Sequence, residues 1–271
     1  MSVLCELEDF YLSYTGEKGI IGRSTQGRPL YYFKVEKTNY PRIIVQYGIH
    51  AREYITTYLA LEHIKEFVKN GKVGTVYFIP SLNPDGVVIC NNENSLYKAN
   101  ANRVDLNVNF NAKWSRGKSN IKNPNSENYV GKFAFSEKES IAIRDFTLKV
   151  RPHATISYHS KGEEIYYQFH QPQKRKTRDR KIALLLSKST GYIIKGTPNS
   201  CGGYKDWCIK KLKIPAFTIE VGKDSLLHPI CKEHLQEIFI KNKRVINVIT
   251  EYFCGTKRKI YVASNKTSRK S

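Results

Sequence analysis

Short runs of β-branched and aromatic residues alternate along this chain with longer segments whose apolar residues recur at helical spacing. Such alternation predicts an α/β fold in which helices connect mostly parallel strands. We expect strands at residues 31–35, 43–47, 75–80, 154–159, 192–195 and 216–221, and helices at residues 53–70, 137–150, 179–190 and 232–253. The pattern therefore predicts one central, mixed but mostly parallel sheet flanked by helices.

The chain shows no internal repeat and no Pro-, Gly- or Ser-rich linker that would divide it. Its 271 residues suit a single domain with a sizeable core. The last 15 residues carry six Lys or Arg and no acidic residue. We therefore predict a folded domain at residues 1–256 and a basic tail at residues 257–271.

The charge balance is strongly basic, with 45 Lys and Arg against 24 Asp and Glu and a net charge of +21. This excess predicts attraction to polyanions and leaves open a non-catalytic polyanion-binding protein, although no nucleic-acid-binding motif accompanies it. No run of 18 apolar residues predicts a membrane span. Acidic residues interrupt the first 20 positions, so we expect no export signal and a cytoplasmic location. The six cysteines form no CxxC pair and are expected to be free thiols.

Three of the predicted strands end in residues that bind metals or transfer protons. His50 and Glu53 follow the second strand, and His159 closes the fourth. Glu220 lies at the end of the sixth strand, where a carboxylate among apolar neighbours is a candidate general base. His50 alone could be a core or surface histidine hydrogen-bonded to the backbone, and a His and a Glu at this spacing occur by chance in many proteins. Ligands gather beyond the carboxyl ends of open α/β sheets, so the three ends together favour a His₂Glu zinc site.

Motifs between residues 20 and 221 resemble the zinc metallocarboxypeptidase family in order and spacing. They include Gly48-Ile49-His50-Ala51-Arg52-Glu53, Asn83-Pro84-Asp85-Gly86, Asp105-Leu106-Asn107, Tyr158-His159-Ser160, Gly202-Gly203-Tyr204-Lys205-Asp206-Trp207 and Phe217-Thr218-Ile219-Glu220. The resemblance implies a zinc carboxypeptidase-like catalytic domain and a hydrolase that acts on peptides.

The resemblance also implies the roles of the residues at the strand ends. One zinc ion per chain would be bound by His50, Glu53 and His159, with water in the open position. Glu220 would take a proton from this water as it attacks the scissile carbonyl, and deliver it to the leaving amine. Asp105 would orient His50 from behind.

Where the family's exopeptidases grip the C-terminal carboxylate with Asn-Arg, this chain has Asn107 followed by Val108. Asn107 is therefore a predicted substrate contact, but valine cannot pair with a carboxylate. Lys98 takes the place of the family's arginine that holds the oxyanion, and is a predicted catalytic residue. Arg103 lies close enough in sequence to be a rival for either role.

Other predicted substrate contacts come from the same motifs. Arg52 lies inside the first motif, and Lys205 occupies the position that tunes specificity for the leaving residue. A lysine there would favour a negatively charged group. The tyrosine of the animal exopeptidases aligns with Pro198, and Tyr204 is a possible substitute.

With these departures the chain resembles one branch of the family, the bacterial γ-D-glutamyl-diaminopimelate peptidases of murein. The resemblance is closest at residues 104–110 and 157–166. This implies an anionic, murein-derived peptide as substrate and no specific nucleic-acid partner. A carboxypeptidase of ordinary peptides remains the alternative activity. Association with the cell wall or a spore by a non-classical route remains the alternative location.

Overall fold

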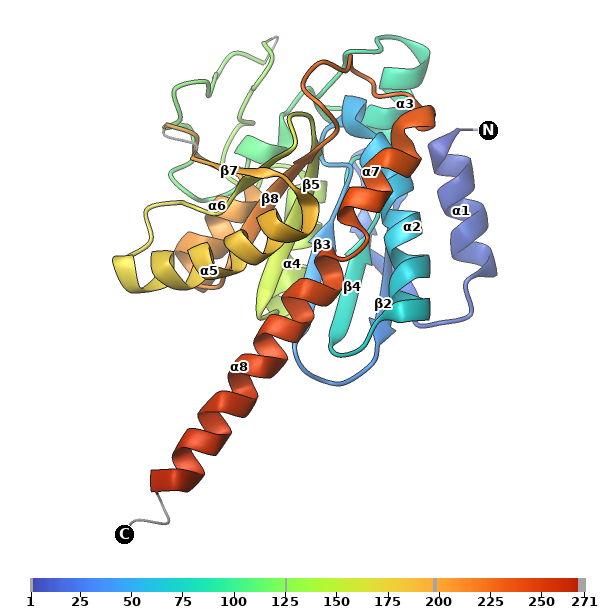
Figure 1. The fold of residues 1–271 in the computed structure, drawn as a ribbon. Coiled ribbons are helices and arrows are strands. Elements are labelled where there is room, and N and C mark those ends of the chain that lie inside the picture. Colours follow the sequence, from blue (N-terminus) through green and yellow to red (C-terminus); the bar gives the residue numbers. More distant parts are fainter. Residues whose placement is uncertain (1, 125, 197–198, 268–271) are drawn as a thin grey trace.

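The computed structural model describes residues 2–124, 126–196 and 199–267, with side chains as far as residue 256. Eight strands form one sheet in the order β1-β2-β4-β3-β5-β8-β6-β7 (Figure 1). The central strands β4, β3, β5 and β8 run parallel, while β1, β2 and β6 pair antiparallel. The strand bounds are β1 Lys18–Arg23, β2 Pro29–Glu36, β3 Arg42–Gln46, β4 Thr75–Ile79, β5 Ala154–Ser160, β6 Glu164–Tyr166, β7 Ile193–Lys195 and β8 Ala216–Val221. The predicted α/β fold with a mixed central sheet is confirmed.

Helices cover both faces of this sheet (Figure 1). One face carries α1 Val3–Ser13, α2 Ile55–Asn70, α5 Gln173–Thr190, α7 Leu235–Asn242 and the beginning of α8 Val245–Thr267. The other face carries α4 Lys138–Val150, α6 Tyr204–Trp207 and the π-helical turn Cys208–Leu212. The remaining helix, α3 Pro84–Asn92, begins after Asn83, whose side chain accepts a hydrogen bond from the Gly86 N–H at 3.0 Å.

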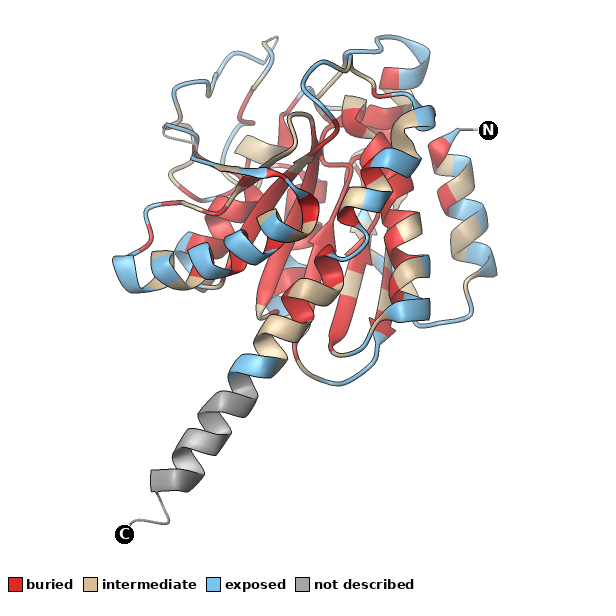
Figure 2. Cartoon of the chain, viewed as in Figure 1, coloured by how far each residue is buried: buried red, intermediate tan, exposed pale blue. Residues whose placement is uncertain are grey.

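The core consists of two apolar layers separated by the sheet. Successive residues of β3 enter opposite layers, because side chains alternate along a strand: Ile43 and Val45 pack into one layer and Ile44 into the other. All three are fully buried. Figure 2 shows the central strands buried between helices whose outer faces are exposed. Strands that are covered on both faces in this way leave only their ends open for chemistry.

All six predicted strands are present, and three of the four predicted helices are confirmed. Helix α5 begins six residues before the predicted residue 179, since its first turns are basic and carry no apolar periodicity. The single helix predicted at residues 232–253 is wrong. A short turn at residues 232–234 precedes α7, and a bend at residues 243–244 separates α7 from α8. The bend allows α7 to pack on α2 while α8 packs on α5.

Two strands, β1 and β6, were not predicted. Strand β1 is an edge strand with two glycines, and its pairing with β2 is interrupted between Ile20 and Gly22. Strand β6 has only three residues, too few for a periodic pattern. Both depend on pairing with a neighbour rather than on local sequence.

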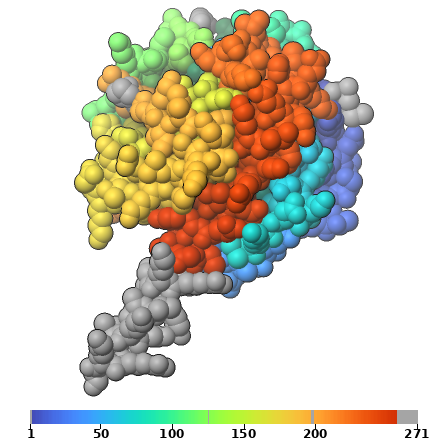
Figure 3. All heavy atoms as spheres, viewed as in Figure 1, coloured from blue at the N-terminus to red at the C-terminus, as the bar shows by residue number. Residues whose placement is uncertain are grey.

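Helix α8 packs on the sheet at its start and then leads away from the body of the protein (Figure 1). It crosses residue 256, and the predicted division into a domain and a basic tail stays a prediction. Figure 3 shows the face on which α5, α7 and the start of α8 lie side by side. No helix in the described ranges is both long and apolar enough to cross a membrane. All six cysteines are unpaired, as predicted.

The core contains one buried histidine away from the strand ends. His63 lies in α2 and is 1% exposed, and its Nδ1 is 2.8 Å from the hydroxyl of Tyr47. Burial lowers the pKa of His63 to about 3, from the ordinary value of 6.5. The folded protein therefore keeps this imidazole neutral over a range of pH in which the unfolded chain protonates it.

This difference predicts that the free energy of unfolding falls as the pH is lowered from 6.5 towards 3. Between these pH values, the free energy of unfolding of His63→Gln should fall less steeply than that of the wild type, by about 1.4 kcal/mol per pH unit. Urea unfolding at several pH values measures the effect, with the exposed His170 replaced by Gln as the control. Parallel pH curves for the wild type and His63→Gln would contradict the prediction.

Candidate metal centre

Two neighbouring parallel strands bring three metal-ligand side chains together. His50 and Glu53 lie on the turn that follows β3, and His159 lies near the end of β5. The two strands are paired in register, with Gln46 opposite Ser157. Ligand atoms of His50, Glu53 and His159 lie within 4.8 Å of one another, and all three residues are buried. The structure therefore assembles the predicted His₂Glu cluster.

The ring of His50 is oriented by Asp105. His50 Nε2 is 3.2 Å from Asp105 Oδ1, and His50 Nδ1 is 2.8 Å from Glu53 Oε1. When His50 presents the lone pair of Nδ1 to a metal ion, its proton is on Nε2, which then donates to Asp105 Oδ1. Nδ1 is then the nitrogen that faces the centre of the cluster. The hydrogen bond is the contact that the orienting role predicted for Asp105 requires, and the role itself stays a prediction.

The ring of His159 is oriented by a serine that the sequence analysis missed. Ser157 Oγ donates its proton to Gln46 Oε1 at 2.5 Å. Since the hydroxyl has only one proton, Ser157 Oγ must accept the hydrogen bond from His159 Nε2, which is 3.2 Å away. His159 Nδ1 then faces Glu53 Oε2 at 3.1 Å. Ser157 lies two residues before His159 on the same face of β5, a strand alternation that could have indicated it.

The cluster favours a positive charge at its centre. Burial alone would lower the pKa of His50, but the carboxylates of Glu53 and Asp105 outweigh it and raise the pKa to about 9. Burial alone would raise the pKa of Glu53, but His50 and His159 outweigh it and hold the pKa well below its usual range. His50 Nδ1 and His159 Nδ1 lie 3.3 Å apart beside the same carboxylate. A buried set of two imidazole nitrogens and one carboxylate fits Zn²⁺.

Glu220 lies next to this cluster on strand β8. It is paired in register with His159 of β5 on one side and with Glu164 of β6 on the other. Burial raises the pKa of Glu220 well above its usual range, and the charges of Glu53 and Glu164 add to this effect. The predicted general base is therefore close to the metal ligands and is inclined to hold a proton.

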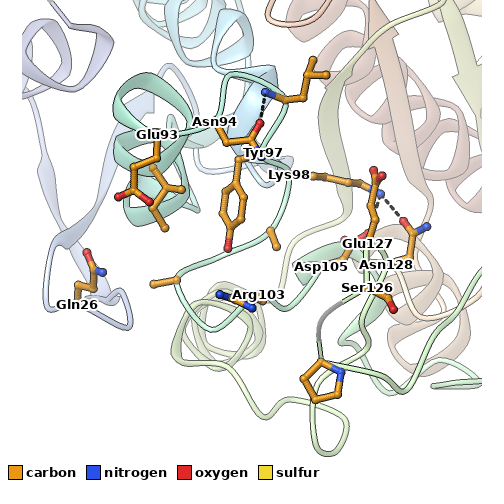
Figure 4. A pocket seen from close by; sticks show the side chains of 15 residues that line it. Gln26, Glu93, Asn94, Tyr97, Lys98, Arg103, Asp105, Ser126, Glu127 and Asn128 are labelled. Carbon is orange, nitrogen blue, oxygen red and sulfur yellow. Dashed lines mark hydrogen bonds and ion pairs between the residues drawn. The ribbon is translucent and has the colours of Figure 1, made fainter.

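Lys98 is brought to the site, but its ammonium group is already paired. Lys98 Nζ is 2.7 Å from Asp105 Oδ2 and donates to Asn128 Oδ1 at 2.7 Å. In Figure 4, Lys98 extends towards Asn128, while Arg103 lies beside Tyr97 across a cavity of about 660 Å³. Among the described lining residues, Lys98 also faces the cavity that contains His50, whereas Arg103 does not. The structure thus places Lys98 nearer the metal ligands than its rival.

Lys205 and Asp206 form an ion pair beside Glu220. Lys205 Nζ is 2.5 Å from Asp206 Oδ1 and donates to the backbone oxygen of Gln168 at 2.9 Å. Both residues are buried, and together with Asn107 and Glu220 they line a cavity of about 170 Å³. The predicted specificity position therefore presents a cation and a carboxylate together, rather than a lone cation.

Asn107 connects this small cavity with a larger one. The larger cavity, of about 430 Å³, is lined by His50, Asn107 and Val108 among others. The side-chain oxygen of Asn107 accepts a hydrogen bond from the backbone N–H of Tyr204 at 3.3 Å. The two cavities thus adjoin at Asn107, and Val108 gives the larger one, which contains His50, an apolar wall.

Two predicted substrate contacts are not brought to the ligands. Arg52 pairs with Glu127 at 3.1 Å and donates to the backbone oxygen of Leu96, and these two partners line the cavity of about 660 Å³. Tyr204 is fully buried, and its hydroxyl lies 2.9 Å from Thr147 Oγ1 in the core. Pro198, aligned with the family's tyrosine, lies outside the described residues.

Comparisons with known proteins agree with this geometry. A model of the zinc carboxypeptidase family matches residues 14–243. The chain is 28% identical over 248 residues to γ-D-glutamyl-L-diamino acid endopeptidase 1 of Lysinibacillus sphaericus. This alignment covers 78% of this chain and 61% of the relative. It is also 28% identical over 272 residues to carboxypeptidase B of Bos taurus, in an alignment that covers 82% of this chain and 63% of the bovine protein. The chain thus spans less than two thirds of the length of these relatives.

The fold has solved counterparts. The structure of bovine thrombin-activatable fibrinolysis inhibitor in complex with tick carboxypeptidase inhibitor superimposes with a TM-score of 0.81. It covers 94% of this chain and 95% of its own, at 23% sequence identity. The likeness therefore extends over nearly the whole of both chains at the level of the fold.

We predict one zinc ion per chain, measured by elemental analysis of the purified protein. His159→Ala should abolish binding, because a ligand is lost. Ser157→Ala should weaken zinc affinity by roughly 10- to 100-fold, since it releases only the orientation of His159. His170→Ala, which removes an exposed histidine, should leave the zinc content unchanged. Full zinc affinity in Ser157→Ala would contradict the assigned hydrogen-bond chain.

Proposed function

The chain belongs to the zinc carboxypeptidase family, and from this premise we propose that it is a zinc-dependent peptidase of murein peptides. The bond that it cleaves joins γ-D-glutamate to diaminopimelate. The observation that carries this substrate is the buried pair of Lys205 and Asp206 beside Glu220. The name of the Lysinibacillus sphaericus relative, a γ-D-glutamyl-L-diamino acid endopeptidase, supports the same bond.

The residues of the cluster would hold zinc, which supplies a Lewis acid that polarises the scissile carbonyl and activates water. Glu220 accepts one proton from the attacking water as its oxygen bonds to the carbonyl carbon. It then gives this proton to the leaving nitrogen as the C–N bond breaks. Burial and the charge of Glu53 raise the pKa of Glu220, and this supports a carboxyl group that can hold the proton between the two steps.

The charge pair at Lys205 discriminates among leaving residues. The distal end of diaminopimelate carries both an ammonium group and a carboxylate. Lys205 and Asp206 offer the complementary charges within one small cavity. A glutamate side chain would bring its carboxylate close to Asp206, and a lysine side chain would bring its ammonium close to Lys205. The pair therefore favours a zwitterionic side chain over either simple charge.

A carboxypeptidase acting on ordinary peptides is the second candidate, and the similarity to bovine carboxypeptidase B favours it. Val108 counts against it, because the arginine of the C-terminal grip is missing. Products from purified murein peptides and from a panel of ordinary peptides, separated by mass spectrometry with and without a chelator, distinguish the two. The cytoplasmic location stays a prediction.

We predict that Glu220→Gln lowers the rate of hydrolysis by about 10²- to 10⁴-fold while the zinc content stays unchanged. The amide keeps the shape of the side chain but cannot accept the proton. The measurement is kcat on L-Ala-γ-D-Glu-diaminopimelate, with elemental analysis of the same samples. Unchanged turnover would exclude Glu220 as the base.

We predict that Lys205→Met shifts the preference of the enzyme among leaving residues. The cavity then keeps the carboxylate of Asp206 without its cationic partner. The value of kcat/KM for diaminopimelate should therefore fall by about tenfold or more, and the ratio of kcat/KM for lysine to that for diaminopimelate should rise. Lys210→Met, an exposed lysine five residues away, is the matched control. An equal loss on both substrates would show that Lys205 does not select the side chain.

A further inference from the structure

The cleft lacks the usual cation at the position next to Asn107. Val108 lines the cavity of about 430 Å³ that contains His50, and an apolar side chain cannot bind a carboxylate there. Lys98 lines the same cavity, but Asp105 at 2.7 Å and Asn128 at 2.7 Å already occupy its ammonium group. Val108 therefore carries no charge, and the charge of Lys98 is balanced by the carboxylate of Asp105.

One further lysine lines this cavity. Within the described part of the chain, Lys98 and Lys118 are the lysines of its lining, and the lining contains no arginine. Lys118 is exposed, and no described carboxylate forms an ion pair with it. Its charge is thus uncompensated by neighbouring side chains, in contrast to that of Lys98.

The backbone at Lys118 is held against the wall of the cleft. The Lys118 N–H donates to the backbone oxygen of Asn199 at 2.9 Å, and Asn120 Nδ2 donates to the backbone oxygen of Cys201 at 3.2 Å. Gly202 in turn packs so closely on Val108 that a Cβ atom there would lie 2.7 Å from the Val108 oxygen. The segment that carries Lys118 is therefore fixed relative to Val108.

The direction of the substrate determines what Lys118 would meet. The cavities of about 430 Å³ and about 170 Å³ share Asn107 and Ser200. If the distal head of the leaving residue binds at Lys205, its main chain must pass Asn107 to reach the metal ligands. On this path the carboxylate on the carbon that bears the scissile nitrogen can enter the larger cavity, whose lining contains Val108 and Lys118.

We infer that Lys118 binds this proximal carboxylate and replaces the missing arginine as a determinant of specificity. The inference rests on the proposed function, since it assumes a leaving residue oriented by Lys205. A lysine is a flexible point charge, so it can reach a carboxylate from a neighbouring loop without the fixed fork of an arginine. The leaving residue would thus be held at two carboxylates by two lysines from different segments.

The test compares L-Ala-γ-D-Glu-diaminopimelate with the analogue whose proximal carboxylate is a carboxamide. We expect the zinc-loaded wild type to favour the carboxylate by about tenfold in kcat/KM. Lys118→Met should lose this preference through a higher KM for the carboxylate, with the carboxamide unaffected. Lys118→Arg should retain it, and Lys132→Met, which removes an exposed lysine outside the cleft, should behave as the wild type. An equal loss on both substrates, or no loss, would overturn the inference.

Binding of free diaminopimelate and of its proximal carboxamide, measured by calorimetry, separates the two proposals. If the wild type cleaves neither peptide but binds diaminopimelate with a preference that depends on Lys118, the proposed cleavage fails and the role of Lys118 stands. If Lys118→Met cleaves with the wild-type preference, the role of Lys118 fails and the proposed cleavage stands. If the protein neither binds nor cleaves, both are overturned.

Discussion

The buried carboxylate of Glu53 is the interaction on which the site depends. Its two oxygens lie 2.8 Å and 3.1 Å from the Nδ1 atoms of His50 and His159, in surroundings where an uncompensated charge would be costly. A cation at this point satisfies all three groups at once. The outer hydrogen bonds, to Asp105 and Ser157, turn both rings so that their Nδ1 atoms meet there. The ligands are therefore prepared for a metal by polar contacts that the fold itself supplies.

The sheet makes this convergence possible. Strands β3, β5 and β8 are adjacent and parallel, so their carboxyl ends meet at one edge. Each is covered on both faces by apolar layers, so the side chains that can meet a ligand lie at the ends, while a polar side chain within a strand, such as Ser157, is hydrogen-bonded inside the protein. The register between β5 and β8 then sets His159 beside Glu220. Backbone pairing thus sets His159 beside Glu220, and the turn after β3 adds His50 and Glu53.

The sequence predicts what local pattern controls. The apolar strands and the residues at their ends were identified because β-branched runs are recognisable and because polar residues at strand ends are unusual. Side-chain direction in loops was not predictable. Arg103 adopts a left-handed backbone with φ of +62° and faces a neighbouring cavity, and Tyr204 turns its hydroxyl into the core. Ser157 shares a strand face with His159, which strand alternation indicates, but its hydrogen bond to Gln46 joins residues that are distant in the sequence. Lys118 lines the cavity that contains His50 from a segment distant in the sequence, so a local pattern gives no signal for it.

The cations behind the net charge of +21 lie in two different environments in the folded chain. Many of the excess cations lie on the surface, as at Lys174, Arg180 and Lys181 of α5, and do not select a substrate. Inside the cleft, charges are paired locally: Lys98 with Asp105, and Lys205 with Asp206. A paired cation attracts little from a distance but orients a ligand that carries both charges. The overall charge attracts anionic molecules from a distance, whereas the pairs at Lys98 and Lys205 act at short range.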